Sequence, residues 1–174
     1  MTNLPLRIRR GVARCHRVDL LAFRDWVEPQ VELRHKIPIH VVPAPTVVAP
    51  DGQVGLGAFA VHSDRIEIWV AADLTDVERD HPDLGADDMR AIVLESLMHE
   101  LMHYEQWRDG RAMNHRGVEQ RAQSAVQKFF NECCSPIVET ETTGSGCARC
   151  AGRRSVPRRG GRCFAARCKR RGEG

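Results

Sequence analysis

The most informative segment of the chain reads Ser96-Leu97-Met98-His99-Glu100-Leu101-Met102-His103-Tyr104, which contains the pattern H-E-x-x-H. In a helix, residues four apart lie one turn above each other on the same face, so His99 and His103 can offer two imidazoles to one metal ion. Glu100 lies beside them, where its carboxylate can hold a water and accept its proton. The pattern therefore predicts a zinc site that activates water for hydrolysis.

The residues around this segment favour a buried helix. Asp87 or Asp88 is the expected N-cap. Apolar side chains then recur at helical spacing and form the expected buried stripe: Met89, Ile92, Val93, Leu97 and Leu101. Two histidines and a glutamate on a buried helix need partners, because unpaired polar groups there are costly. The metal interpretation is therefore favoured over a surface helix with two solvated histidines.

A catalytic zinc needs a third protein ligand and an open position for water. The H-x-x-G-x-x-H continuation is absent, because Gln106 and Asp109 stand where its glycine and second histidine would be. Two candidates remain. Glu119 opens an apolar-periodic stretch that predicts a second helix, with its first turn facing inward. His115 lies just ahead of that helix and is the rival ligand.

The segment from His99 to Trp107, followed by Glu119-Gln120-Arg121-Ala122, resembles the small gluzincin-type metallopeptidases. These have H-E-x-x-H on one helix and a glutamate ligand, here Glu119, in an E-x-x-A pattern on the next. The same segment followed by His115 also resembles the SprT-like family, in which the third ligand is a histidine and a C-terminal zinc ribbon follows. Arg116 interrupts the H-G pair that is usual in that family, so the sequence favours Glu119 over His115.

The resemblance implies a zinc-dependent metallopeptidase with an α+β, zincin-like fold. One Zn²⁺ would be bound by His99, His103 and Glu119, and Glu100 would be the general base. The substrate would be a peptide or protein, held extended along a sheet edge near residues 66–70. The alternative from another class is a non-catalytic, nucleic-acid-associated adaptor that keeps the zincin scaffold and acts through a basic zinc-binding tail.

Three segments are typical of strands and predict a small mixed or antiparallel sheet ahead of the metal helix. They are residues 37–42, 54–62 and 65–70. The last alternates most cleanly, with Ile66, Ile68 and Val70 facing one side. A short turn joins it to the segment before it, so these two should form a hairpin. The Gly55-x-Gly57 pair predicts a local irregularity in the first strand of that hairpin.

The rest of the main body carries weaker signals. Asp19 is the expected cap of a helix that ends near Pro29 and carries an apolar stripe: Leu20, Leu21, Phe23, Trp26 and Val27. Residues 1–17 are basic and weakly patterned, which predicts a flexible arm. Residues 73–85 are acidic and polar and are expected to form a surface loop. Residues 1–138 are expected to form one metallopeptidase domain.

The C-terminal part of the sequence differs in composition. Residues 139–146 are rich in Thr, Gly, Ser and Glu and predict a linker. Residues 147–174 then contain two pairs of cysteines at metal-like spacing: Cys147 and Cys150, and Cys163 and Cys168. These pairs favour a zinc-ribbon-like tail that binds a second, structural Zn²⁺. The alternative is a disordered basic tail with free thiols.

Charge is unevenly distributed along the chain. Residues 147–174 hold ten Lys or Arg and one acid, a net charge of +9, which leaves −6 for the remainder of a chain whose total is +3. A basic tail on a mildly acidic body indicates an anionic partner for the tail, and DNA or RNA is the first candidate.

The composition of the chain also gives an expectation for the cellular compartment of the protein. The 174-residue chain has no apolar run as long as a membrane span and no apolar segment after its N-terminal arginines that would indicate a secretory signal. Four of its seven cysteines cluster at metal-like spacing, which is more typical of a reducing compartment than of a disulfide scaffold. We therefore expect a cytoplasmic protein without a membrane partner.

Overall fold

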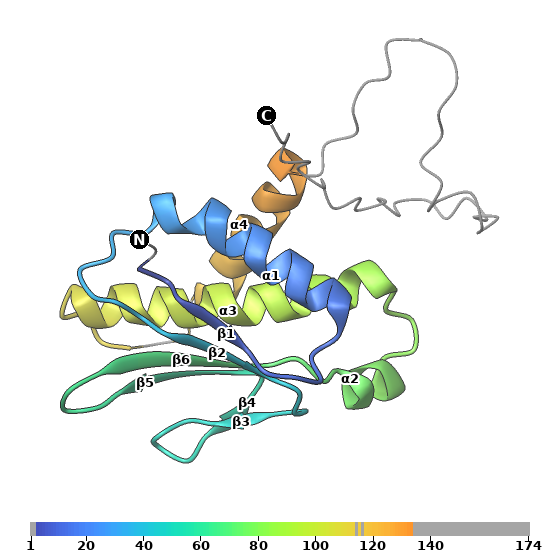
Figure 1. Ribbon diagram of the computed structural model, residues 1–174, viewed down its shortest axis with the longest axis horizontal. Coiled ribbons are helices and arrows are strands. Elements are labelled where there is room, and N and C mark those ends of the chain that lie inside the picture. Colours follow the sequence, from blue (N-terminus) through green and yellow to red (C-terminus); the bar gives the residue numbers. More distant parts are fainter. Residues whose placement is uncertain (1–2, 114, 116, 134–174) are drawn as a thin grey trace, which may run out of the picture.

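The computed structural model describes residues 3–113, 115 and 117–133, which form a mixed α+β fold (Figure 1). Its main sheet has four strands in the order β1-β2-β6-β5. Strands β1, β2 and β6 are mutually parallel, and β5 runs antiparallel to β6. Their bounds are Leu6–Ile8 for β1, Ile39–Val42 for β2, Gly57–Val61 for β5 and Ile66–Ala71 for β6. The expected mixed sheet and its β5–β6 hairpin are confirmed.

Helices α1 and α3 cover one face of this sheet (Figure 1). Helix α3 packs against β5 and β6, while α1 packs against α3 and β1, and α4 packs against α3 (Figure 1). The helices are α1, Arg14–Val27; α2, Thr75–Asp80; α3, Ala86–Arg108; and α4, Val118–Cys133, with a short 3-10 turn at Glu28–Gln30. The predicted metal helix and the second helix after it are therefore both present.

The core lies between α3 and the inner face of the sheet. Ile68 and Val70 of β6 are fully buried, as are Leu97 and Leu101 of α3. Burying one such side chain contributes roughly 1.5–3 kcal/mol. Glu67, in contrast, points from β6 to the outer face, where its carboxylate contacts histidines. The period-two alternation predicted for this strand is confirmed.

A small two-stranded sheet lies on the other side of the main sheet. Its strands are β3, Val47–Val48, and β4, Val54–Gly55, which pair antiparallel. They cover a second apolar cluster made of Val42, Val47, Ala58 and Ala71. The expected long strand over residues 54–62 is broken at Leu56, between β4 and β5, which is the irregularity predicted from the Gly55-x-Gly57 pair.

The N-terminal segment is more ordered than expected. Instead of a flexible arm, it contains β1, whose residues pair with β2, and it contributes the fully buried Leu4. Helix α1 also begins earlier, at Arg14, so Asp19 is not its N-cap. Asp19 is buried inside that helix, where the Arg90 guanidinium of α3 donates to both of its carboxylate oxygens, one at 2.6 Å. This ion pair joins α1 to α3.

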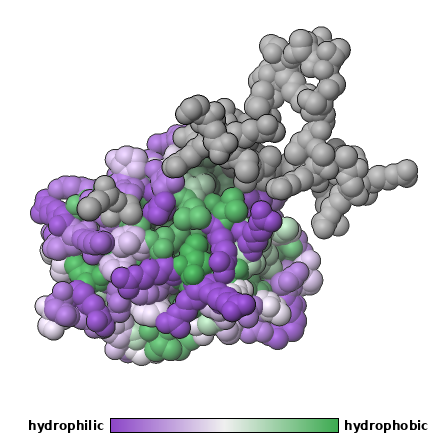
Figure 2. Space-filling view, viewed as in Figure 1, coloured by the Kyte–Doolittle hydropathy of each residue, from purple (hydrophilic) through white to green (hydrophobic). Residues whose placement is uncertain are grey.

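Helix α1 shows the amphipathic pattern expected of a covering helix. Leu20, Phe23 and Val27 are buried against the core. Figure 2 shows apolar groups gathered over α1 in the middle of one face of the molecule, surrounded by hydrophilic residues. The large apolar side chains that α1 exposes are Val18 and Leu21, at 41% and 43%.

Two further predictions are corrected around α3. Residues 73–85, expected to be a loop, contain the short helix α2. Helix α3 begins at Ala86 with Gly85 as its N-cap, in place of Asp87 or Asp88. Asp88 instead accepts a hydrogen bond from the Gly85 amide at 2.7 Å, as an acid three residues after the cap can do.

The linker at 139–146 and the four tail cysteines, Cys147, Cys150, Cys163 and Cys168, lie outside the described residues. No helix within the described part of the chain has the length and apolar character that a membrane span requires.

Candidate metal centre

Three histidines converge beside α3. His99 and His103 come from the helix itself, and His115 comes from the segment between α3 and α4. One ring nitrogen of each lies within 4.8 Å of the others. The Nε2 atoms of His99 and His103 are 3.0 Å apart, and His99 Nε2 is 3.2 Å from His115 Nδ1. These three residues could hold one metal ion.

The orientation of His103 is fixed by Gln106. The His103 Nδ1–H group donates to Gln106 Oε1 at 3.0 Å, and both side chains are buried. A neutral imidazole has one N–H and one lone pair, so this bond leaves the lone pair of His103 on Nε2. That atom is the one that faces His99. A second residue that orients a ligand in this way is common in metal sites.

Burial keeps the histidines in the form that binds metals. Burial is the main cause that lowers the pKa of His99, and the neighbouring His103 and His115 lower it further, whereas the charge of Glu119 acts in the opposite direction. Burial also lowers the pKa of His103, against the hydrogen bond to Gln106. Metal ions bind the unprotonated imidazole, so both shifts favour binding near neutral pH.

His115 reaches the other two through a tight chain reversal. Gly110 and Gly117 both have positive φ, at 65° and 72°, which glycine adopts without strain. The Arg111 amide donates to the Gln106 carbonyl at 2.8 Å, and the Val118 amide donates to the His115 carbonyl at 3.1 Å. The reversal is thus tied to α3 at one end and leads into α4 at the other.

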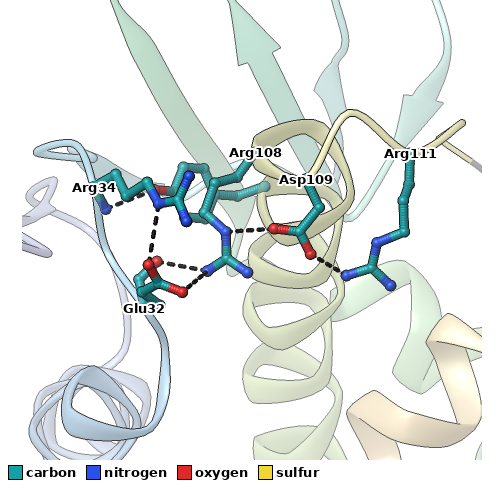
Figure 3. A network of polar contacts seen from close by, with 6 residues as sticks. Glu32, Arg34, Arg108, Asp109 and Arg111 are labelled. Atoms are coloured by element: carbon teal, nitrogen blue, oxygen red, sulfur yellow. Dashed lines mark hydrogen bonds and ion pairs between the residues drawn. The ribbon is translucent and has the colours of Figure 1, made fainter.

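A polar network holds the start of this reversal (Figure 3). The Arg108 guanidinium donates to the Glu32 carbonyl and to Asp109, each at 2.7 Å. The other Asp109 oxygen accepts a hydrogen bond from Arg111. These bonds from Arg108 and Arg111 lower the pKa of Asp109 to about 2, so its carboxylate is charged under ordinary conditions. The network joins the end of α3 to the segment that precedes β2.

Glu119, the ligand favoured by the sequence, is not part of the histidine cluster. It is the second residue of α4 and is exposed, whereas Ala122 one turn later is buried. Its carboxylate lines the same cleft as the histidines and acts on His99 through its charge. Glu119 therefore lies in the cleft but outside the group of converging ring nitrogens, and this arrangement favours the rival ligand, His115.

Glu100 lies beside the histidines and is buried, with an exposed fraction of 7%. Burial raises its pKa to about 7, against the effect of a hydrogen bond from the Phe59 backbone. A Cβ atom placed on Gly57 would lie only 2.5 Å from Glu100 Oε1. Strand β5 therefore positions this carboxylate in two ways. The Phe59 amide donates a hydrogen bond to it, and Gly57, which has no side chain, leaves the space that it occupies.

Strand β5 is also the edge of the sheet next to the histidines. The sequence placed that edge near residues 66–70, but β6 lies inside the sheet, between β2 and β5. His62 N donates to Arg65 O and Ala71 N donates to Leu56 O, so even-numbered residues of β5 bond to β6. Backbone groups of Gly57, Phe59 and Val61 consequently turn toward the free edge.

A cleft of about 580 Å³ connects these parts. One wall is α3, a second is the chain from Ala49 to Phe59, and the third combines Met113 and His115 with the first turns of α4. His99, Glu100, His103, His115 and Glu119 all line it. The cleft can therefore admit a ligand to the three ring nitrogens and to the Glu100 carboxylate at once.

Comparisons of the chain with protein-family models, with curated proteins and with solved structures find no match.

Sequence reasoning missed three contributors to the site. Gln106 carries no motif signal of its own, and its role depends on lying three residues after His103 on the same helix face. Phe59 acts through its backbone amide, which no side-chain pattern reports. Gly57 was recognisable only as an irregular point in a strand, although a glycine there often marks a close approach by another group.

Proposed function

We propose that this protein is a zinc-dependent metallopeptidase with a zincin-like fold. The observation that carries the proposal is the convergence of three imidazole nitrogens next to the buried Glu100, in a cleft bordered by a free strand edge. Each part has a counterpart in what hydrolysis of a peptide requires: ligands for a metal, a base, and a surface that holds an extended chain.

The donor set fits zinc. Bonds of about 2.1 Å in a tetrahedral arrangement separate two ligand nitrogens by roughly 3.4 Å. The corresponding separations from His99 are 3.0 Å to His103 and 3.2 Å to His115. Three imidazoles without a fourth protein ligand are typical of catalytic sites, which keep one position open. When bound, zinc would polarise the scissile carbonyl and lower the pKa of a water molecule.

Glu100 is the proposed general base. Its carboxylate accepts a proton from the attacking water and passes it to the nitrogen of the leaving amine, which cannot depart as an anion. Phe59 N–H and the space at Gly57 fix the position of the carboxylate. A base held in one place by its neighbours loses less entropy as the reaction proceeds.

The free edge of β5 is the proposed substrate-binding strand. An extended peptide can pair with it through main-chain hydrogen bonds, as in β-augmentation. Because the Phe59 N–H is directed to Glu100, the Phe59 carbonyl and the outward N–H and C=O groups of Gly57 and Val61 remain for pairing. Such pairing places a peptide bond alongside α3, on the side of the histidines.

The test is cleavage of an unstructured protein by the zinc-loaded full chain, followed by mass spectrometry of the products. The Glu100→Gln variant should keep its zinc, measured by elemental analysis, because Glu100 is not among the proposed ligands. It should lose activity by about 10² to 10⁴, the usual contribution of a general base. A metal-replete Glu100→Gln variant with wild-type activity would refute the role of this residue, and an inactive wild type would refute the function.

A further inference from the structure

Glu95 lies in the cleft but has no role in the hydrolytic site. It is one helical turn before His99 on α3, so both residues lie on the same side of that helix. Its side chain is half-buried, and no described residue donates a hydrogen bond to it or forms an ion pair with it. Burial raises its pKa, which reflects the cost of keeping this carboxylate charged away from water. Removing a carboxylate from water without a partner is costly, so a cationic ligand at this point would be favourable.

The charge of the cleft points the same way. Its lining includes three carboxylates besides Glu100, namely Asp51, Glu95 and Glu119, and no lysine or arginine among the described residues. Asp51 accepts a hydrogen bond from the Gln53 amide at 3.0 Å, and Glu119 acts on His99. Among the described carboxylates that line the cleft, Asp51 and Glu119 are exposed and Glu100 accepts a hydrogen bond from Phe59, so Glu95 is the half-buried one without a hydrogen bond or an ion pair. A cleft of one sign of charge attracts ligands of the opposite sign.

A second hollow adjoins Glu95. A groove between α3 and α4 is lined by Glu95, by three apolar side chains and by uncharged polar side chains. The apolar ones are Ala91, Val126 and Phe130, and the polar ones are Gln123, Ser124, Gln127 and Asn131. Lys128 also lines this groove, but its ammonium group pairs with Glu132 at 3.7 Å. A groove of mixed lining with apolar side chains near a carboxylate suits a long aliphatic side chain with a positive tip, since the stem can pack on the apolar part while the charge pairs with the carboxylate.

We propose that Glu95 selects peptides with a lysine or arginine side chain, whose stem lies in the groove between α3 and α4 and whose cation pairs with the Glu95 carboxylate. This inference rests on the proposed peptidase function and adds a substrate class to it. The pair would form in a partly enclosed place, where a hydrogen bond to a charged group contributes more than it does at an open surface.

The experiment compares two peptides that differ only in one residue, lysine or glutamine, placed in turn at each position on both sides of the cleaved bond. Binding is measured by fluorescence anisotropy on the zinc-loaded Glu100→Gln full chain, and cleavage is measured on the active full chain. Each is repeated with Glu95→Gln, which keeps the shape and removes the charge. Glu105→Gln is the matched control, because Glu105 lies on α3 but lines neither hollow.

The lysine peptide should bind and react about tenfold better than its glutamine partner at one position, which corresponds to one charged hydrogen bond. Glu95→Gln should abolish that preference and leave the glutamine peptide unchanged, while Glu105→Gln should keep it. Glu95→Lys should reverse the preference toward a glutamate peptide. Equal binding of the lysine and glutamine peptides by the Glu100→Gln chain, or a preference that survives Glu95→Gln, would overturn the inference. Selective binding without any cleavage by the wild type would keep it and refute the peptidase function alone.

Discussion

The missing side chain at Gly57 leaves room for the carboxylate of Glu100, and this contact is testable with a single methyl group. A Cβ atom at Gly57 would lie within 3.0 Å of three atoms of Glu100, so that side chain would have to move. A misplacement of about 1 Å in a catalytic group can cost on the order of 100-fold in rate. Gly57→Ala should therefore lower kcat by roughly that factor while zinc content and KM change little.

Gly55→Ala is the control for this prediction. A Cβ atom at Gly55 would meet the Gly57 carbonyl oxygen at 3.5 Å, an ordinary contact. Both variants place alanine in the same extended segment, so a general effect on the strand should appear in both. Wild-type kcat in Gly57→Ala, or an equal loss in Gly55→Ala, would mean that the close approach to Glu100 has no catalytic consequence.

The identity of the third ligand is decided by comparing two substitutions. His115→Ala should lower zinc occupancy strongly, because it removes one of three converging nitrogens. Glu119→Ala should leave occupancy near that of the wild type, because its carboxylate is outside the cluster. Equilibrium dialysis against zinc, followed by elemental analysis, measures both. The reverse order of occupancy would restore Glu119 as the ligand.

The sequence could not resolve this choice for a physical reason. His99 and His103 share one regular helix, so a spacing of four residues alone places them together. The position of His115 depends on a chain reversal that is set by two positive-φ glycines and by hydrogen bonds from Arg111 and Arg108. None of these has a periodic signal, and an E-x-x-A pattern at a helix start was the stronger local cue.

At the scale of elements, the local sequence pattern predicted the central helix α3 and the central strand β6, but it missed the edge strand β1 and the order of the strands. Helix α3 and strand β6 carry long apolar patterns and were predicted correctly. Strand β1 has only three residues and is stabilised by parallel pairing with β2. Its partner lies far along the chain, since Leu6 pairs with Ile39. Strand order is equally invisible to local pattern, so β6 was taken as the edge in place of β5.

The network in Figure 3 should contribute stability that depends on pH. The pKa of Asp109 is lowered from 3.8 to about 2, so the folded state favours its charged form. That contribution is fully present above pH 3.8 and is lost as pH falls through about 2. Asp109→Asn should therefore unfold at lower urea concentration than the wild type at pH 6, and the gap should narrow between pH 4 and pH 2.

This comparison is made on metal-free protein, so that loss of metal in acid does not enter the difference. Asp76→Asn, on the short helix α2, is the matched control, because Asp76 pairs with Arg79 away from the chain reversal. A gap between Asp109→Asn and the wild type that stays constant down to pH 2 would show that the Asp109 charge does not stabilise the fold.

For the whole molecule, the division of charge predicts separate roles for the two parts of the chain. Residues 147–174 carry +9 and the remainder carries −6, which by itself should repel phosphates. Removing 147–174 should leave cleavage of a small peptide nearly unchanged and should weaken binding to DNA or RNA. Binding by the full chain should fall steeply with salt, and sequence preference should be slight, because contacts to phosphate carry no base information.

A titration of both chains with labelled single-stranded and double-stranded DNA at two salt concentrations tests this division. A variant with the tail arginines at 153, 154, 158 and 159 changed to glutamine controls for simple loss of length. Equal affinities for the full and shortened chains, without dependence on salt, would assign the tail to another partner, such as an acidic protein.

A metal ion bound by His99 and His115 would also stabilise the fold. The two residues are sixteen positions apart, His99 on α3 and His115 in the connection between α3 and α4. An ion held by both closes that length of chain into a ring, as a disulfide would, and removes conformational freedom from the unfolded state. Unlike a disulfide, this metal-mediated cross-link is lost when the ion dissociates. The availability of the metal would then determine how stably the connection that leads into α4 is held against α3, apart from any chemistry in the cleft.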